Sequence, residues 1–85
     1  MVKLDSSILE IVRELNPRIA GQVIESDTNL LDCGALDSAL MVQLVLRLED
    51  KFSIKFEFED MRQESFRDLA SIRNLLTAKY KVQVA

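Results

Sequence analysis

Histidine and tryptophan are missing from this 85-residue sequence, and cysteine occurs once, at Cys33. Without histidine the chain lacks the commonest general base and the commonest transition-metal ligand. A single cysteine excludes an internal disulfide and a metal cluster held by the thiolates of one chain. Because no histidine can activate it, we interpret Cys33 as an ordinary loop side chain rather than a nucleophile. Few catalytic classes remain open to this chain.

The sequence also lacks a run of about 18 apolar residues that could cross a membrane, and its N-terminus shows no basic region followed by an apolar stretch. We therefore expect a cytoplasmic protein without an integral membrane segment. The 14 acidic and 11 basic residues give a net charge of −3, and the basic residues are scattered apart from a short tail around Lys79 and Lys81. Nucleic acid is not an expected partner, because phosphate binding needs clustered Lys and Arg.

The length predicts one domain, residues 1–85, with an ordered core from about residue 4 to residue 80. So short a chain has no room for both a core and a deep catalytic cavity, so we expect a monomer that presents a surface or a single group and is not an enzyme. Three segments have apolar residues at helical spacing. They are Leu4 to Leu15, Ser38 to Phe52, and Asp68 to about Tyr80.

Local sequence signals define the ends of these helices. Ser7 and Glu10 fit a capping box for the first helix, and Asn16-Pro17 ends it, because the residue before proline is disfavoured in a helix. Asp37 and Asp68 are predicted N-caps. Arg73 and Lys79 are expected near the negative end of the last helix dipole. The predicted inward faces are Leu40, Met41, Leu44, Val45 and Leu48 in the second helix, and Leu69, Ile72, Leu75 and Leu76 in the last.

The segments between the helices carry apolar residues that we expect to anchor them to the core. In the long first loop, Arg18 to Asp37, these are Ile19, Val23, Ile24, Leu30, Leu31 and Leu36. After the second helix, an extended connector should insert Ile54, and Phe56 or Phe58, into the core. A short helical turn is predicted around Glu59 to Gln63. The nearby carboxylates Glu57, Glu59 and Asp60 match no cation-binding loop and are interpreted as a solvated face, so no metal site is predicted. The fold is all-α, with three principal helices and one short helix.

Leu36-Asp37-Ser38 lies where the first loop meets the second helix. A serine there is most often a capping residue. The position also suits a phosphodiester, because free backbone N–H groups and the helix dipole stabilise negative charge. Ser38 has no neighbouring base, so an enzyme would have to activate its hydroxyl.

The surrounding residues resemble the acyl carrier protein and peptidyl carrier protein family over nearly the whole chain. The matching residues are Ile24, Asp27, Thr28, Leu30, Gly34, Leu36-Asp37-Ser38, Val42, Leu44, Leu48-Glu49, Phe52, Ile54 and Leu69-Ala70-Ser71-Ile72. The resemblance implies a four-helix bundle with a long loop between helices 1 and 2. It also implies that Ser38 receives 4′-phosphopantetheine from coenzyme A, and that the arm's thiol holds an acyl or aminoacyl group as a thioester. Asp37 would cap the helix and help the modifying transferase to recognise the site.

Ala39, Val42 and Leu46 lie at helical spacing on the side of the second helix away from Leu44 and Leu48. If the side with Leu44 and Leu48 faces the core, Ala39, Val42 and Leu46 are exposed. Exposed apolar residues at helical spacing often mark a docking surface. A helix buried on nearly all sides is the alternative. The resemblance places the partner-binding patch at these positions, and we expect Gln43 and Arg47 to belong to the same patch.

The implied partners are a phosphopantetheinyl transferase, a loading ligase for the acyl or aminoacyl group, and downstream acyl-transferring enzymes. Ala39 replaces the large aliphatic residue of fatty-acid carriers, and Gln43 and Arg47 stand where those carriers often have acidic or neutral residues. We therefore expect a specialised pathway, with a similarity to discrete D-alanyl or other aminoacyl carriers. Two other hypotheses are an unmodified adaptor that binds partners through the second helix, and an enzyme that uses Cys33 or Ser38 directly.

Overall fold

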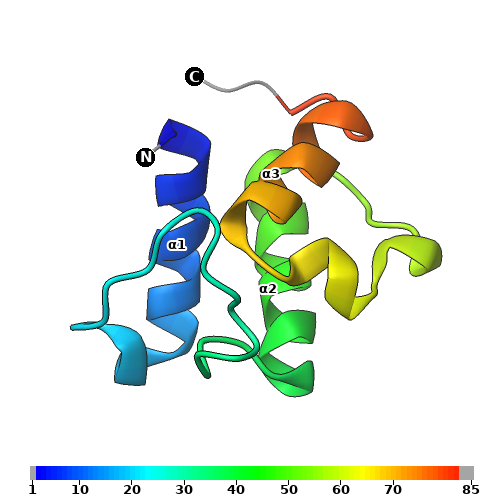
Figure 1. The fold of residues 1–85 in the computed structure, drawn as a ribbon. Helices are drawn as coiled ribbons and strands as arrows, with labels where there is room; N and C mark the ends of the chain where they lie inside the picture. Colours follow the sequence, from blue (N-terminus) through cyan, green and yellow to red (C-terminus); the bar gives the residue numbers. More distant parts are fainter. Residues whose placement is uncertain (1, 83–85) are drawn as a thin grey trace.

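The computed structural model describes residues 2–82, and within this range the chain forms three α-helices and no strand (Figure 1). The α-helices are α1 (Lys3–Leu15), α2 (Ser38–Phe52) and α3 (Leu69–Ala78). Three 3₁₀ turns lie between them: η1 (Pro17–Ile19), η2 (Phe58–Asp60) and η3 (Gln63–Phe66). The predicted all-α fold is confirmed. The turn predicted around Glu59 to Gln63 is divided between η2 and η3, and the predicted domain ends, residues 1 and 83–85, lie outside the described residues.

The core lies between the three helices, each of which turns one apolar face inward. The largest fully buried apolar side chains are Ile8, Val12, Leu30, Leu44, Leu48, Phe66, Leu69, Ile72 and Leu76. The inward faces predicted for α2 and α3 are confirmed in their centre, whereas Leu40, Met41 and Leu75 at the edges are only partly buried. α2 has the predicted bounds, and α3 ends at Ala78, two residues earlier than predicted.

The bounds of α1 agree within one residue with the predicted segment from Leu4 to Leu15, but its cap differs from the prediction. α1 begins at Lys3 and has Val2 as its N-cap residue, so Ser7 lies within the helix. The Ser7 hydroxyl donates to the Lys3 carbonyl oxygen (3.2 Å). The predicted capping box of Ser7 and Glu10 is therefore wrong, because the helix begins at Lys3, before both residues.

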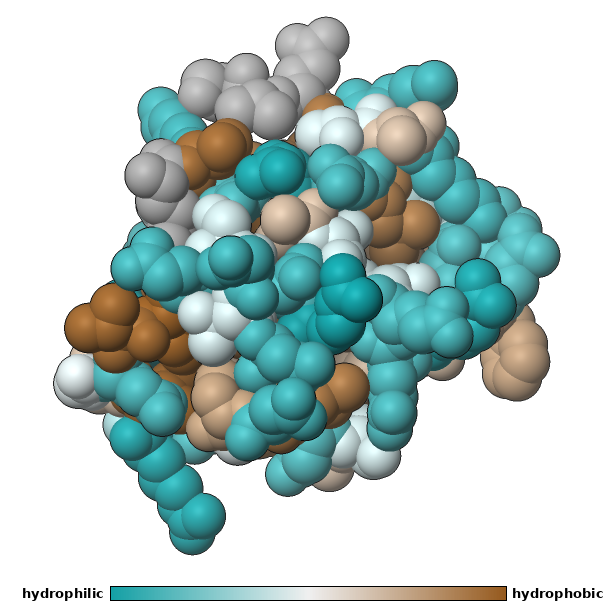
Figure 2. Space-filling view, in the orientation of Figure 1, coloured by the Kyte–Doolittle hydropathy of each residue, from teal (hydrophilic) through white to brown (hydrophobic). Residues whose placement is uncertain are grey.

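Loop 1 (residues 20–37) is fixed to the core and to α3 by several contacts. Ile24, Leu30 and Leu36 are buried as predicted, as is Ile19 in η1, and Leu31 packs partly buried against the core. Val23 is 81% exposed, so its predicted anchoring role is wrong. Figure 2 shows hydrophobic surface on the side of the molecule where Figure 1 places α1 and loop 1.

A buried ion pair connects α1 with α3. Asp5 is fully buried, and one of its carboxylate oxygens, Oδ2, lies 2.7 Å from Arg73 Nη1 and accepts from the Ser26 hydroxyl (2.6 Å). The carbonyl oxygen of Ser26 also accepts from the Ala70 N–H (3.0 Å). The predicted role of Arg73 as a helix-dipole partner is replaced by this cross-helix contact, which joins α1, loop 1 and α3 at one point.

The connector (residues 53–68) leaves α2 through Ser53, which has a left-handed backbone conformation. Phe56 is buried, and its ring packs on the rings of Phe66 (5.9 Å) and Tyr80 (5.1 Å between centroids). Phe58 is 93% exposed, and Ile54 packs partly buried against the core. Of the two phenylalanines considered for the core, Phe56 is therefore the one that enters it.

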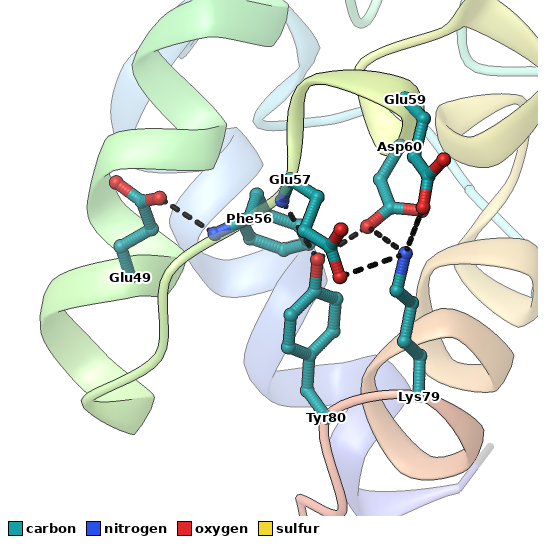
Figure 3. Close-up of polar contacts among 7 residues, drawn as sticks. All are labelled: Glu49, Phe56, Glu57, Glu59, Asp60, Lys79 and Tyr80. Atoms are coloured by element: carbon teal, nitrogen blue, oxygen red, sulfur yellow. Dashed lines mark hydrogen bonds and ion pairs between the residues drawn. The ribbon is translucent and has the colours of Figure 1, made fainter.

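Charged groups hold the connector against the end of α3 (Figure 3). The Lys79 ammonium lies 3.2 Å from Glu57, 2.9 Å from Glu59 and 3.0 Å from Asp60, and Asp60 also accepts from the Tyr80 hydroxyl. These carboxylates are not simply the solvated face that the sequence predicts, because they surround one cation and Asp60 is buried. Lys79 thus pairs with the connector as well as ending α3. Among the described residues, no group of acidic or cysteine side chains is arranged to hold a metal ion.

The ionisation of Asp60 contributes to this attachment. Burial by itself raises the pKa of Asp60, but hydrogen bonds from Tyr80 and Lys79 outweigh it and hold the pKa below its ordinary value. A carboxyl group with a lowered pKa stabilises the fold at pH values above its unfolded pKa of about 4, and this contribution is lost as the pH falls further.

We expect the Asp60→Asn protein to be less stable than the wild type at pH 6, and the difference to shrink below about pH 4. Urea unfolding of both proteins at pH 6 and pH 3 measures this difference. Asp68 also has a lowered pKa, because hydrogen bonds from Ser71 and contact with Arg67 outweigh its burial, so both proteins should lose some stability in acid. An Asp60→Asn effect of equal size at both pH values would contradict the prediction.

Candidate functional site

The start of α2 is fixed by Asp37, as the sequence predicts. Asp37 has an extended backbone, and its Oδ1 accepts from the Leu40 N–H (2.8 Å) while its carbonyl oxygen accepts from the Met41 N–H (2.8 Å). The side chain therefore satisfies one of the N–H groups that have no partner within the first turn. This cap sets the residue at which the helix begins, and that residue is Ser38.

Ser38 is exposed, in the first turn of α2. An enzyme can therefore reach this residue from solvent. The first N–H groups of a helix point toward this end, and the helix dipole adds positive potential. The position combines free access to a hydroxyl with an environment that favours a phosphate group.

The loop before Ser38 is packed into the core. Gly34 has φ +82°, a conformation that glycine adopts without strain. Ala35 and Leu36 are buried, and the Leu36 N–H donates to the Leu30 carbonyl oxygen (3.0 Å). These contacts fix the backbone of loop 1 up to Asp37, so the position of the exposed Ser38 is also fixed.

The predicted docking residues lie on the outer side of α2. Val42 is 47% exposed and Leu46 60% exposed, and Ala39, Gln43 and Arg47 are also exposed. Leu44, Val45 and Leu48 on the opposite side are buried. The expected exposure of the apolar residues Ala39, Val42 and Leu46, which we call the α2 stripe, is therefore confirmed, and the alternative of a helix buried on nearly all sides is wrong.

Arg47 has a partner that the sequence did not reveal. Its Nη2 lies 2.9 Å from Oε2 of Glu14 in α1, and both side chains are about half exposed. The two residues are 33 positions apart, so no local pattern connects them. Because Glu14 offsets the charge of Arg47, the surface beside the α2 stripe is less positive than the sequence of α2 suggests.

Comparison with known families identifies the family of this chain. A family model described as "phosphopantetheine attachment site" matches residues 6–76, which include most of α1, loop 1, α2, the connector and most of α3. The chain belongs to this carrier protein family. No curated protein and no solved structure matches the carrier.

The carrier protein therefore bears a covalently attached 4′-phosphopantetheine group, and it interacts with a phosphopantetheinyl transferase and with the enzymes of a pathway. The predicted resemblance of the chain to this family is confirmed. The residues at the start of α2 fit such a group, because an exposed hydroxyl stands where helix N–H groups favour a phosphate. Within residues 2–82 no helix of the carrier is long and apolar enough to span a membrane.

Cys33 lies close in sequence to this site but takes little part in its geometry. It is half-buried in loop 1, and its thiol points at the Leu30 carbonyl oxygen at 3.7 Å. In the carrier it packs against the core cluster. This environment agrees with the interpretation of Cys33 as an ordinary loop side chain.

Proposed function

We propose that Ser38 is the residue to which the phosphopantetheine group of this carrier is attached. The observation that carries the proposal is the exposed position of Ser38 in the first turn of α2, directly after the capping residue Asp37. When attached, the group supplies a terminal thiol that holds an acyl or aminoacyl chain as a thioester. We propose that the carrier itself catalyses no reaction and acts as a monomer in the cytoplasm.

The chain's own residues position the hydroxyl and leave its activation to the transferase. The Asp37 carboxylate accepts from the Leu40 N–H, so it is engaged as a cap and fixes the first turn. The N–H groups at the start of α2 then favour the negative phosphodiester on Ser38. We propose that the transferase recognises this capped turn, with Asp37 as part of the recognised surface.

We further propose that partner enzymes dock on the α2 stripe and that Gln43 and Arg47 border the contact. The exposed apolar side chains and the pairing of Arg47 with Glu14 favour partners with an apolar contact surface over partners with a strongly basic one. Together with the small Ala39, this favours a specialised acyl or aminoacyl pathway with its own loading ligase, close to discrete D-alanyl or aminoacyl carriers, over bulk fatty-acid synthesis.

Incubation with coenzyme A and a broad-specificity phosphopantetheinyl transferase tests the attachment. Intact-mass measurement should show the addition of one phosphopantetheine group, and peptide mapping should locate it on Ser38. Absence of any addition to folded protein, with a transferase that modifies a known carrier in parallel, would overturn the proposal. That result would favour the unmodified adaptor, which acts through the α2 stripe alone.

Replacement of Leu46 tests the docking proposal. We expect Leu46→Ser to lower kcat/KM for modification by the transferase about tenfold, because an apolar contact worth between about 1 and 2 kcal/mol is lost. Val23→Ser serves as the matched control, since Val23 is more exposed than Leu46 and lies on loop 1. Equal rates for the Leu46 variant and the wild type would show that Leu46 does not contribute to binding of the transferase.

A further inference from the structure

We infer that Asn16 is a positioning residue that holds the end of loop 1 and thereby presents Ser38 for modification. The inference rests on the proposed attachment at Ser38, and it assigns part of that site to a residue 22 positions away in the sequence. Figure 1 shows the spatial basis, since α1 ends and α2 begins at the same end of the molecule.

Asn16 directly follows α1 and is nearly buried, with 8% of its surface exposed. Its backbone N–H still donates to the Val12 carbonyl oxygen (2.9 Å), but Pro17 prevents the helix from continuing. The side chain therefore has a fixed position directly after the last turn of α1. From this point it reaches across to loop 1.

Both donor hydrogens of the Asn16 side-chain amide are engaged. Its nitrogen Nδ2 donates to the carbonyl oxygens of Gly34 (3.1 Å) and Ala35 (3.2 Å), and its oxygen Oδ1 accepts from the Arg18 N–H (3.3 Å). An amide nitrogen carries two hydrogens, which is the number that these two carbonyl groups need. The Ala35 contact is buried, so water does not readily replace the donor.

The two carbonyl groups belong to the part of loop 1 that leads into the site. Only Leu36 and Asp37 separate Ala35 from Ser38, and Leu36 is itself buried. The segment that Asn16 holds, Gly34 and Ala35, includes the left-handed backbone conformation at Gly34 that precedes α2. Asn16 therefore fixes the approach to α2 on one side, while Asp37 fixes the first turn on the other.

This arrangement predicts an effect on modification separate from the effect on folding. A transferase that binds the start of α2 meets a segment already held in place, and such preorganisation lowers the entropic cost of reaching the reactive geometry. Asn16→Asp keeps the size of the side chain and an acceptor for Arg18, but an ionised carboxylate has no hydrogen to donate to Gly34 and Ala35.

Transfer of the arm from coenzyme A by a broad-specificity transferase measures the consequence. We expect Asn16→Asp to lower kcat/KM about tenfold, which corresponds to about 1.4 kcal/mol of transition-state stabilisation. Amide hydrogen exchange at Leu36, whose N–H donates to Leu30, should accelerate by a similar factor. Asn16→Ala also removes both donors but introduces no charge, and it provides the test if Asn16→Asp does not fold.

Tyr80→Phe is the matched control. It also preserves size while removing two hydrogen bonds, those with Glu57 and Asp60, but it acts on the connector. The control should leave both the modification rate and the exchange at Leu36 unchanged. Wild-type rates in a folded Asn16 variant, or equal slowing by Tyr80→Phe, would overturn the inference. Failure of the wild-type protein to gain the arm would instead refute the attachment at Ser38.

Discussion

The Ser38→Ala protein should gain no phosphopantetheine when it is incubated with coenzyme A and an active transferase. The substitution removes the only hydroxyl in the first turn of α2, and alanine is a good helix former, so the helix should be retained. Asp37 continues to cap the helix through Leu40. Intact-mass measurement gives the degree of modification, and circular dichroism verifies that the helices are formed.

Ser6→Ala is the matched control for this experiment. Ser6 is another exposed serine near the start of a helix, α1, and its replacement should leave the mass gain of the wild type unchanged. A mass gain retained by Ser38→Ala would mean that another residue carries the arm. Loss of modification in both variants would point to a general defect in the protein rather than to removal of the attachment residue.

Arg73→Met should cause the largest loss of stability among the single-residue changes considered for the ion pairs. Asp5 is fully buried, and Arg73 supplies the positive charge that compensates its carboxylate at 2.7 Å. Removing one partner of a buried pair leaves an uncompensated charge, which typically costs about 3–5 kcal/mol. Domains of this kind have a total unfolding free energy of about 5–15 kcal/mol, so urea unfolding should show a large shift.

The same substitution at Arg47 provides the comparison. Arg47 and Glu14 form a pair of similar distance, 2.9 Å, but both side chains are about half exposed. Pairs of this kind contribute about 0–1 kcal/mol, because solvent screens them and two flexible side chains must be ordered. If Arg73→Met and Arg47→Met lower the free energy of unfolding equally, the burial of Asp5 does not make its ion pair with Arg73 more important for stability than the exposed pair.

Features that depend on neighbouring residues in the sequence could be predicted well. Asp37 and Asp68 each accept from a backbone N–H three positions later, Leu40 and Ser71, and both were predicted as N-caps from residue type and position. The bounds of α2 followed from the same signal together with the helical spacing of its buried residues. The position of Ser38 at the start of α2 could be predicted for the same reason, because the adjacent cap Asp37 determines where the helix begins.

Contacts between distant parts of the chain could not be predicted. The sequence identifies Asn16 only as the end of a helix, because its Asn-Pro pair gives no indication that the side chain reaches Gly34 and Ala35. The choice of Phe56 over Phe58 for the core likewise depends on the rings of Phe66 and Tyr80, which the fold brings together. Alternation along the connector shows which residues share a side but not which of them meet the core.

The two ends of α2 are attached to the rest of the molecule by different physical forces. At its start, the uncharged and nearly buried amide of Asn16 holds loop 1, whereas beyond its end the partly exposed ammonium of Lys79 holds the connector through three carboxylates. Dissolved ions shorten the reach of exposed charges, to about 3 Å at 1 M salt, but leave buried neutral hydrogen bonds almost unaffected. A higher ionic strength should therefore weaken the contacts of Lys79 with the connector, while the hydrogen bonds that hold the approach to Ser38 are retained.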